Sequence, residues 1–189
     1  MHTLVIYAHP YEKSFNHAIF SSIVTNLKRY NKKVVCIDLY KDQFDPTYSP
    51  SELALFSSGK TEDPLVKQYQ EFLIEAQEVI FIFPIWWNDV PAIVKGFIDK
   101  VMKKEFAYTS TATGIKGKIT NVDKLTVYTT STSPTWYIRL FCGDAIKKVF
   151  IGASLRQIGI KNAKWHNFGT IQRRTQHDRA HYLSKLIAQ

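Results

Sequence analysis

The segment that decides the fold is VIFIFPIWWNDVPAIVKGFIDKV, residues 79–101. It begins with a continuous apolar run, which is typical of a strand buried on both faces. A proline, two adjacent tryptophans and a short polar turn follow, and a helical pattern starts near Pro91. Successive side chains of an extended segment diverge, so Trp86 and Trp87 cannot both enter one core. We expect at least one of them to line a cleft, the alternative being that both cap the core beneath a neighbouring loop.

The alternation of apolar runs and amphipathic segments continues along the chain on both sides of this segment. We expect strands at residues 3–8, 33–38, 79–83, 124–130 and 163–169. We expect helices at 15–30, 51–56, 64–77, 90–103, 139–158 and 175–188, and a long loop at 105–123. Near-continuous apolar strands that alternate with helices predict a doubly wound α/β fold, with a parallel sheet covered by helices on both faces. For five strands the flavodoxin-like order 2-1-3-4-5 is expected, in a single domain over residues 1–189.

Composition limits the classes of function. The 189 residues include 45% hydrophobic and 14% aromatic side chains, enough for a large core. The formal net charge is +9, but the basic residues form scattered pairs, which indicates a solvated surface or attraction for anionic ligands such as nucleotides rather than a nucleic-acid partner. Cys36 and Cys142 are far apart, so neither a disulfide framework nor a metal site is expected, and a reducing cytoplasm fits. No apolar run reaches the roughly 18 residues of a membrane helix, and the N-terminus lacks a signal-peptide pattern, so no stable membrane insertion is expected.

Ligands of such a sheet bind outside the carboxyl ends of its strands, near the point where the strand order reverses. The loops at 9–15, 84–90 and 129–137 should therefore carry the function. The first precedes a helix whose N-terminus could hold a phosphate, with His9, Ser14 and Asn16 as added donors, although an ordinary capped helix fits this loop equally well.

The other two loops suit a flat ring. A tryptophan at the end of the third strand could stack on an aromatic ligand. The hydroxyl-rich loop at 129–137 would let backbone amides approach the edge of a heterocycle closely, although such loops are also common without a function. No GxGxxG or Walker sequence is present, so a dinucleotide fingerprint or a P-loop is not supported.

Four motifs together resemble one family. They are AHPYEKSFN at 8–16, FPIWWNDVPAIVKGFIDKV at 83–101, EFAYT at 105–109 and TTSTSPTWY at 129–137. In this order and spacing they resemble the flavodoxin-like NAD(P)H:quinone oxidoreductases, a group that includes bacterial NAD(P)H oxidoreductases and modulator-of-drug-activity enzymes. The resemblance extends to about residue 160.

The resemblance implies a noncovalently bound flavin. It assigns the flavin phosphate to His9, Ser14, Phe15 and Asn16. It assigns the isoalloxazine ring to Pro84, Ile85, Trp86, Trp87 and Asn88, and the pyrimidine edge of the ring to Thr129, Thr130 and Ser131. FAD is slightly favoured over FMN; the chain is shorter than the animal quinone reductases, which leaves the adenine half of FAD less protected.

The implied reaction passes a hydride from NAD(P)H through the flavin to a quinone or a similar small acceptor, with ping-pong kinetics. Tyr137 matches a tyrosine that stabilises the reduced flavin. The histidine that assists it in well-studied members is replaced by Cys142, within FCGD, so Tyr137 would act alone or through water. Tyr108 matches an aromatic residue of the acceptor site, often across a homodimer interface. The aromatic loops 104–109 and 134–141 are both expected at the ligand edge of the sheet, where they would form that interface.

Two other classes of function stay open at this stage. An electron-carrier flavoprotein is one, although such carriers are typically acidic and lack a tryptophan-rich rim. The other is a flavin-binding regulatory subunit that docks on a membrane transporter.

Overall fold

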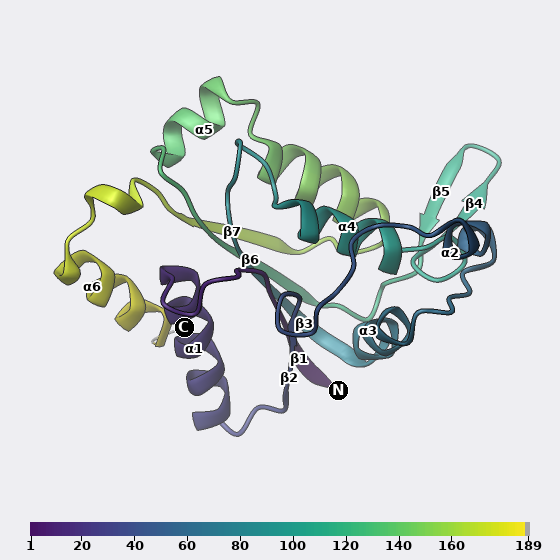
Figure 1. Cartoon of the computed structure of the whole chain (residues 1–189), viewed down its shortest axis with the longest axis horizontal. Coiled ribbons are helices and arrows are strands. Elements are labelled where there is room, and N and C mark those ends of the chain that lie inside the picture. Colours follow the sequence, from purple (N-terminus) through teal and green to yellow (C-terminus); the bar gives the residue numbers. More distant parts are fainter. Residues whose placement is uncertain (188–189) are drawn as a thin grey trace.

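A computed structural model of the chain describes residues 1–187, and its centre is a five-stranded parallel sheet (Figure 1). The strands are β1 (His2–Tyr7), β2 (Val34–Asp38), β3 (Ala76–Pro84), β6 (Lys124–Thr130) and β7 (Ala163–Phe168). They lie in the order β2-β1-β3-β6-β7, and every neighbouring pair is parallel. The flavodoxin-like order expected from the sequence is therefore confirmed.

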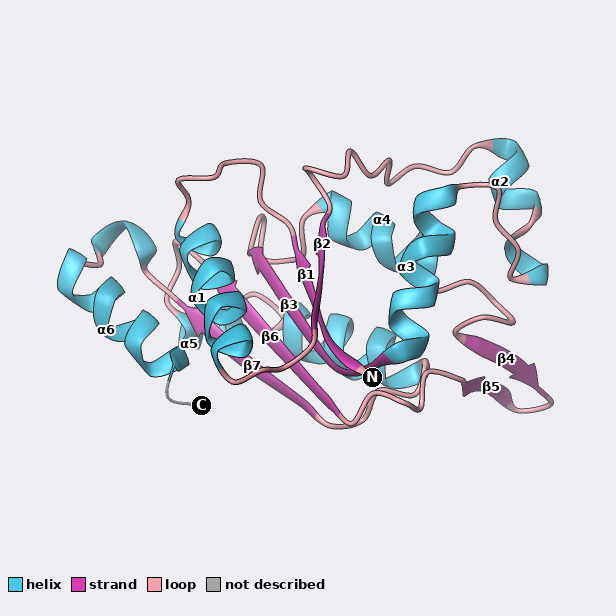
Figure 2. Ribbon diagram, turned by 90° about the horizontal axis from the view of Figure 1, so that it is seen from below, coloured by secondary structure: helices cyan, strands magenta, loops and turns pink. Residues whose placement is uncertain are grey.

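Helices cover both faces of this sheet (Figure 2). One face carries α1 (Phe15–Arg29) and α6 (Gln176–Ile187). The other carries α3 (Pro64–Glu75), α4 (Ala92–Val101) and a π-helix, η2 (Ile146–Leu155). Alternate residues of β1 enter the two cores, with Leu4 and Ile6 in one and Val5 and Tyr7 in the other. Burial on both faces explains why the strands are continuous apolar runs.

The long loop expected at 105–123 contains a hairpin, so that expectation was wrong in part. Its strands are β4 (Tyr108–Thr111) and β5 (Gly114–Gly117), which pair antiparallel. Both strands are short and largely exposed, so the segment lacks the apolar alternation that reveals a strand. Three further short elements are α2 (Pro50–Ala54), η1 (Phe56–Ser58) and η3 (Ile171–Arg173).

The single helix expected at 139–158 was also wrong. The chain instead forms α5 (Thr135–Phe141), which starts after Pro134, and then η2. Gly143 and Asp144 separate them with φ values of 76° and 54°, in a left-handed conformation that no right-handed helix contains. Of the helix expected at 175–188, residue 188 lies outside the described residues.

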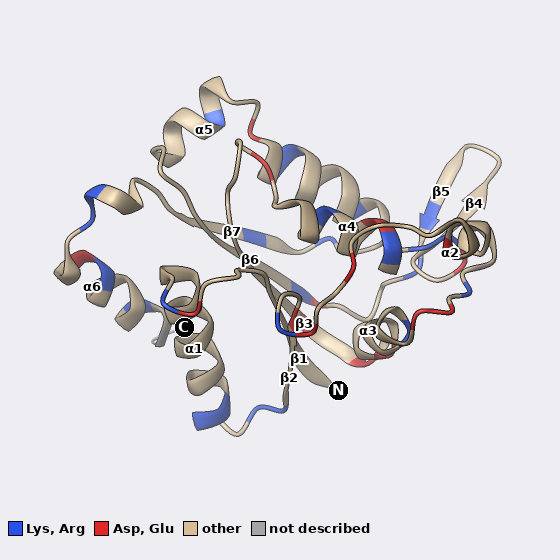
Figure 3. Ribbon diagram, viewed as in Figure 1, with Lys and Arg blue, Asp and Glu red and all other residues tan. Residues whose placement is uncertain are grey.

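Two buried lysines, one in α4 and one just after it, form ion pairs with carboxylates of the connection between β2 and α3. Lys103 bonds the Glu52 carboxylate, and Lys100 Nζ lies 3.2 Å from Asp63 Oδ2. The other Lys and Arg positions are spread over most elements (Figure 3). Within residues 1–187, none of the helices is both long and apolar enough to cross a membrane.

Candidate functional site at the carboxyl ends of the strands

Backbone hydrogen bonds hold together the loops that leave the sheet. Ala8 N donates to Ile82 O (2.9 Å), Ile85 N to Thr130 O (2.8 Å) and Ser131 N to Phe168 O (3.2 Å). These bonds continue the strand pairing beyond Tyr7, Pro84 and Thr130. The loops after β1, β3, β6 and β7 are therefore neighbours, as the parallel sheet requires.

A tight turn carries the two tryptophans. Trp86 and Asp89 exchange both backbone hydrogen bonds, each 3.1 Å long. Between them, Trp87 and Asn88 have φ values of 52° and 66°, as in a type I′ turn. Trp87 is 99% exposed and Trp86 42% exposed, which confirms that at least one of them lies outside the core. A bulky residue in the left-handed region stores strain, and such strain is typical of functional sites.

The connection after β6 and the first two residues of α5, together called loop 131–136, are held by one amide side chain from β7. Asn167 Oδ1 accepts a hydrogen bond from the Thr129 hydroxyl (2.8 Å). Asn167 Nδ2 donates to Ser131 Oγ (2.9 Å) and Thr135 Oγ1 (3.0 Å). Trp165 Nε1 adds a bond of 2.8 Å to Thr129 Oγ1. Thr129 and Ser131 are buried, so their hydroxyls serve the scaffold of the loop rather than facing solvent.

A small pocket separates the turn from the loop. It has a volume of about 220 Å³ and is lined by Ile85, Trp87, Asn88, Ser131, Thr132, Ser133 and Ile138. An aromatic wall thus faces a hydroxyl-rich wall beyond the carboxyl ends of β3 and β6.

The loop after β1 has mainly internal contacts. Ser14 Oγ accepts from His17 N (3.1 Å) and caps α1. Asn16 is buried, and its Nδ2 donates to Thr130 Oγ1 (2.9 Å), while its Oδ1 has no hydrogen-bond partner within residues 1–187. His9 Nδ1 accepts from Tyr11 N (3.0 Å) and its ring meets that of Trp86 edge-on at 6.2 Å; burial lowers the pKa of His9.

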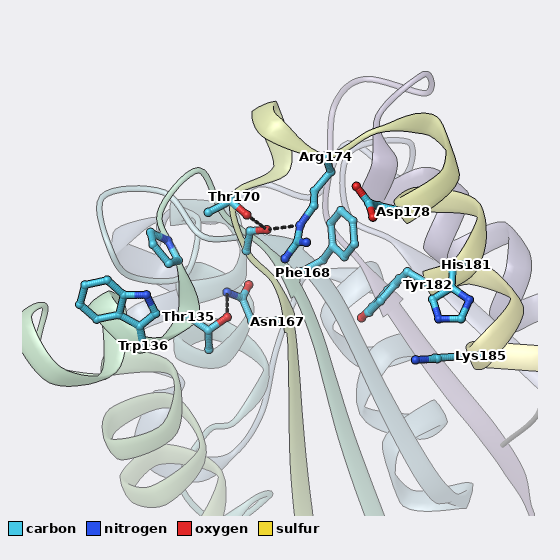
Figure 4. Close-up of a pocket in the computed structure, with 12 residues that line it drawn as sticks. Thr135, Trp136, Asn167, Phe168, Thr170, Arg174, Asp178, His181, Tyr182 and Lys185 are labelled. Atoms are coloured by element: carbon cyan, nitrogen blue, oxygen red, sulfur yellow. Dashed lines mark hydrogen bonds between the residues drawn. The ribbon is translucent and has the colours of Figure 1, made fainter.

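A larger pocket beyond the end of β7 is the part of the site that sequence reasoning missed (Figure 4). Its volume is about 570 Å³, and basic side chains at its wall include Arg174, His181 and Lys185. The Arg174 guanidinium lies over the Phe168 ring at 5.3 Å, and its Nε donates to Gly169 O (3.2 Å). The sequence did contain a signal, because the pair Arg173–Arg174 lies in the connection after β7, at the edge of the sheet where ligands bind.

Aromatic rings pack around this second pocket and fix its inner wall. Phe15, from the start of α1, packs against Phe168 with ring centroids 4.7 Å apart, and Phe168 packs against Tyr182 at 4.8 Å. Asp178 lies in the first turn of α6, and its Oδ2 accepts hydrogen bonds from the backbone N and the hydroxyl group of Thr175, each 2.9 Å long. These bonds lower the pKa of the Asp178 carboxyl group. Arg174 and Lys185 outnumber this single carboxylate, so the net charge offered to a ligand is positive.

Tyr137 and Tyr108, the two tyrosines expected near the reaction, lie far apart in one chain. Tyr137 is in the first turn of α5, 43% exposed, and stacks on Phe141 at 5.5 Å. Tyr108 begins the β4–β5 hairpin, which Figures 1 and 2 show at the opposite end of the molecule from α5. The expectation that loop 104–109 lies at the ligand edge was therefore wrong for a single chain, because α4 carries the chain away from that edge. Cys142, half-buried, caps the other end of α5.

A family model described as a flavodoxin-like fold matches residues 1–189. The chain belongs to this family, Flavodoxin_2. The family fold is the one that places the loops described above around one edge of the sheet.

The names of similar proteins agree with the resemblance that the motifs show. An uncharacterized NAD(P)H oxidoreductase of Haemophilus influenzae is 28% identical over 172 residues, 90% of this chain and 85% of that protein. NAD(P)H dehydrogenase [quinone] 1 of Cavia porcellus is 34% identical over 150 residues, 71% of this chain but 54% of that protein, so the chain spans about half the length of this mammalian relative. The crystal structure of Smu.1420 from Streptococcus mutans UA159 has a TM-score of 0.87 and 29% identity, covering 100% of this chain and 97% of that one. The resemblance to flavodoxin-like NAD(P)H:quinone oxidoreductases is thereby confirmed.

The geometry suits a ligand with a flat ring and an anionic tail. The turn with Trp87 offers an aromatic surface, and Thr132 and Ser133 offer hydroxyl groups across the small pocket. Arg174 and Lys185 place positive charge in the adjoining pocket, as a phosphate requires. Loop 131–136 lines both pockets, so one molecule could contact both.

Proposed function

We propose that this chain is a flavin-dependent oxidoreductase that uses NAD(P)H to reduce a quinone or a similar small acceptor. The observation that carries the proposal is the exposed tryptophan turn, which faces a rigid hydroxyl-rich loop at the carboxyl ends of β3 and β6. The named relatives, NAD(P)H oxidoreductases and quinone dehydrogenases, support the donor and the acceptor.

A flavin fits the residues present. Pro84, Ile85, Trp86, Trp87 and Asn88 would lie along the ring, and Thr129, Thr130 and Ser131 would shape the strand end beneath its edge. Asn16 Oδ1 is a buried acceptor that still lacks a partner within residues 1–187. The start of α1, with His9, Ser14, Phe15 and Asn16, would hold the flavin phosphate. The pocket with Arg174 and Lys185 would receive further phosphate and nucleoside groups, which supports the slight preference for FAD over FMN. When bound, a flavin supplies the capacity to accept a hydride from NAD(P)H and to release the electrons to a second substrate.

The side chains of this protein would position the bound ring and stabilise the negative charge that develops on it. Asn167 holds the amides and hydroxyls of loop 131–136 in place before any ligand arrives, which is electrostatic preorganisation. Tyr137, in the first turn of α5, would donate a hydrogen bond from its hydroxyl group to negative charge that develops on a bound ring. Donor and acceptor would use the same open surface over Trp86 and Trp87 in turn, so each must leave before the next one binds.

A homodimer belongs to the proposal. The exposed side chains of α5, Trp136, Tyr137, Leu140 and Phe141, form an apolar face of the kind that marks an interface or a binding site. A second copy of the chain could bring its Tyr108 to the acceptor site, which one chain alone does not do. Both cysteines are free, in keeping with the proposed cytoplasmic location.

The deciding experiment starts with the purified protein. We expect a flavin absorption spectrum, one flavin per chain released by heat and identified by mass, and turnover of NAD(P)H with a quinone that gives parallel lines in double-reciprocal plots. Light scattering should report a dimer. Flavin without turnover would identify an electron carrier or a regulatory subunit instead, and intersecting lines with a monomer would reject the shared site.

A further inference from the structure

A third cavity lies away from the ligand edge, on the face of the sheet that carries α1 and α6. Its volume of about 690 Å³ exceeds that of either pocket described above. The strand residues in its wall are Glu78, Ile80, Lys124, Thr126, Tyr128, Lys164 and His166, from β3, β6 and β7. Several of them lie at the amino ends of these strands, whereas a flavin would bind beyond the carboxyl ends. The cavity is therefore separate from the proposed active site, and nothing in the proposed reaction uses it.

The inner wall of this cavity is apolar and aromatic. Helices α1 and α6 contribute Ile23, Leu27 and Leu186. Tyr128 and His166 stack across neighbouring strands, with ring centroids 5.3 Å apart and an interplanar angle of 19°. Cavities of about 300–1,000 Å³ with such walls are typical of sites for small organic ligands.

The rim of the cavity is positively charged. Lys32, Lys124 and Lys164 line it, against one carboxylate, Glu78, so two positive charges are left over. Glu78 is already paired with Lys124 (2.9 Å) and Lys32 (3.8 Å), whereas Lys164 has no ion pair within residues 1–187. Burial and the charges of Lys164 and Lys124 lower the pKa of His166, in keeping with a positive field. An anion would be attracted to this rim.

A polar atom without a partner also lies at the wall. Asn26 of α1 is 9% exposed, and its Nδ2 donates to Leu186 O at 3.4 Å. Its Oδ1 is buried without a hydrogen-bond partner within residues 1–187. Buried polar atoms are nearly always bonded, and this oxygen is an acceptor, so a donor such as a bridging water would complete it when a ligand fills the cavity.

We propose that this cavity is a second ligand site, which binds an amphiphilic anion, namely a carboxylate attached to an apolar body. The carboxylate lies against Lys164 at the rim, and the apolar body packs on Ile23, Leu27 and Ile80. The site is independent of the proposed redox function, because none of its residues lines either pocket at the carboxyl ends of the strands.

Decanoate is a suitable probe, and decanamide is its neutral counterpart of the same length. Isothermal titration of the protein as purified should show one decanoate bound per chain and at least about tenfold weaker binding of decanamide, because charge-assisted contacts are the strong ones. Equal affinity for the two compounds would overturn the requirement for an anion and with it the proposal.

Three variants test the location. Lys164→Glu should weaken decanoate binding by at least about tenfold, since it replaces an attractive charge with a repulsive one. Lys161→Glu makes the same change of net charge at an exposed position outside the cavity, and should leave the affinity nearly unchanged. Replacing Trp86 and Trp87 with Ala should also leave it unchanged. An equal loss of affinity in the two lysine variants would show general attraction of anions to the basic surface. A loss in the tryptophan variant would show that decanoate binds at the ligand edge. Either result would reject the site.

Discussion

The loop after β6 and the turn after β3 face each other across one pocket, yet they are held in opposite ways. Loop 131–136 is anchored from below by Asn167, which bonds three hydroxyl side chains. The turn at Trp86–Asp89 depends on two backbone hydrogen bonds and exposes almost the whole of Trp87. The difference suggests a division of labour, in which the polar wall is preformed and the aromatic wall gains its packing when a ligand or a second chain covers it.

The free energies of hydrogen bonding and of backbone strain support this contrast. A typical hydrogen bond within a protein contributes about 1 kcal/mol net, and leaving a buried group unpaired costs about 1–3 kcal/mol, so the Asn167 cluster strongly disfavours other loop conformations. A residue in a sparsely populated backbone region costs about 1–3 kcal/mol, and the turn contains a tryptophan in that position. The loop should therefore be rigid and the turn mobile in the free protein.

The largest expected effect comes from breaking the rigid wall. Asn167→Leu removes three hydrogen bonds and should lower the free energy of unfolding by about 3 kcal/mol, measured by urea denaturation. Asn162→Leu is the matched control, since the exposed Asn162 makes one side-chain bond, to Asp123 O at 3.2 Å, and its loss should cost less than about 1 kcal/mol. Equal losses in the two variants would show that Asn167 does not anchor the loop.

The sheet and the loop positions could be read from the sequence for a physical reason. Burial on both faces requires continuous apolar strands, and β6 begins and ends at the residues that this pattern predicts, Lys124 and Thr130. Parallel strands then bring 84–90 and 129–137 to one edge without any knowledge of side-chain contacts.

Long-range contacts and local conformations could not be read in this way. Asn167 acts through Ser131, 36 residues away, and nothing near either residue predicts the pair. The break between α5 and η2 depends on the left-handed φ of Asp144 after Gly143, whereas a glycine alone is tolerated within many helices. The pocket after β7 was missed because Arg173–Arg174 matched the pattern of a solvated basic pair.

A smaller effect, on binding rather than stability, is expected from removing the exposed wall. Replacing Trp86 and Trp87 together with Ala should weaken flavin binding by about thirtyfold, or about 2 kcal/mol, because the aromatic contact is lost. The free energy of unfolding should change by less than about 1 kcal/mol, as for other exposed side chains. Fluorescence titration with flavin measures the affinity, and Ile74→Ala, which truncates an exposed side chain on α3, serves as the control. Unchanged affinity in the double variant would move the ring away from this turn.

Tyr137 lies in the first turn of α5, and its hydroxyl is expected to matter for the rate of flavin reduction but not for flavin binding. Tyr137→Phe should slow reduction of the flavin by NAD(P)H about tenfold, because one donor aimed at developing charge is lost. Flavin affinity should stay nearly unchanged. Stopped-flow absorbance gives the rate, and Tyr40→Phe, in the loop after β2, is the control. A variant that reacts at the wild-type rate would leave Tyr137 with a packing role against Phe141.

The strain in the turn is testable by itself. Trp87→Gly should raise the free energy of unfolding by about 1 kcal/mol, because glycine adopts positive φ without steric cost. Trp87→Val should lower it, since a β-branched residue is the least suited to that conformation. Urea denaturation of the two variants in parallel provides the comparison, and a valine variant as stable as the glycine variant would show that the turn is not strained.

The smallest effect concerns His9, which lies in the loop after β1 and packs edge-on against Trp86. Burial lowers the pKa of His9 below its usual 6.5, so the unfolded chain takes up this proton more readily than the folded chain. The contribution of His9 to stability is therefore complete above about pH 6.5 and is lost as the pH falls through the lowered pKa of the folded state. Protonation at Nδ1 would also end the hydrogen bond from Tyr11 N, and so loosen the loop beside Trp86.

His9→Asn isolates this effect, because an amide oxygen can accept the same bond from Tyr11 but does not titrate. His2 and His166 also have lowered pKa values, and they titrate equally in both proteins, so the difference between wild type and variant belongs to His9. Between pH 7 and pH 5, urea denaturation should show a smaller loss of stability in the variant than in the wild type. If the two proteins lose stability in parallel, His9 is as easily protonated in the folded chain as in the unfolded one. The mobility of the turn would then depend on the strain at Trp87 and on its ligand, and not on protonation of His9.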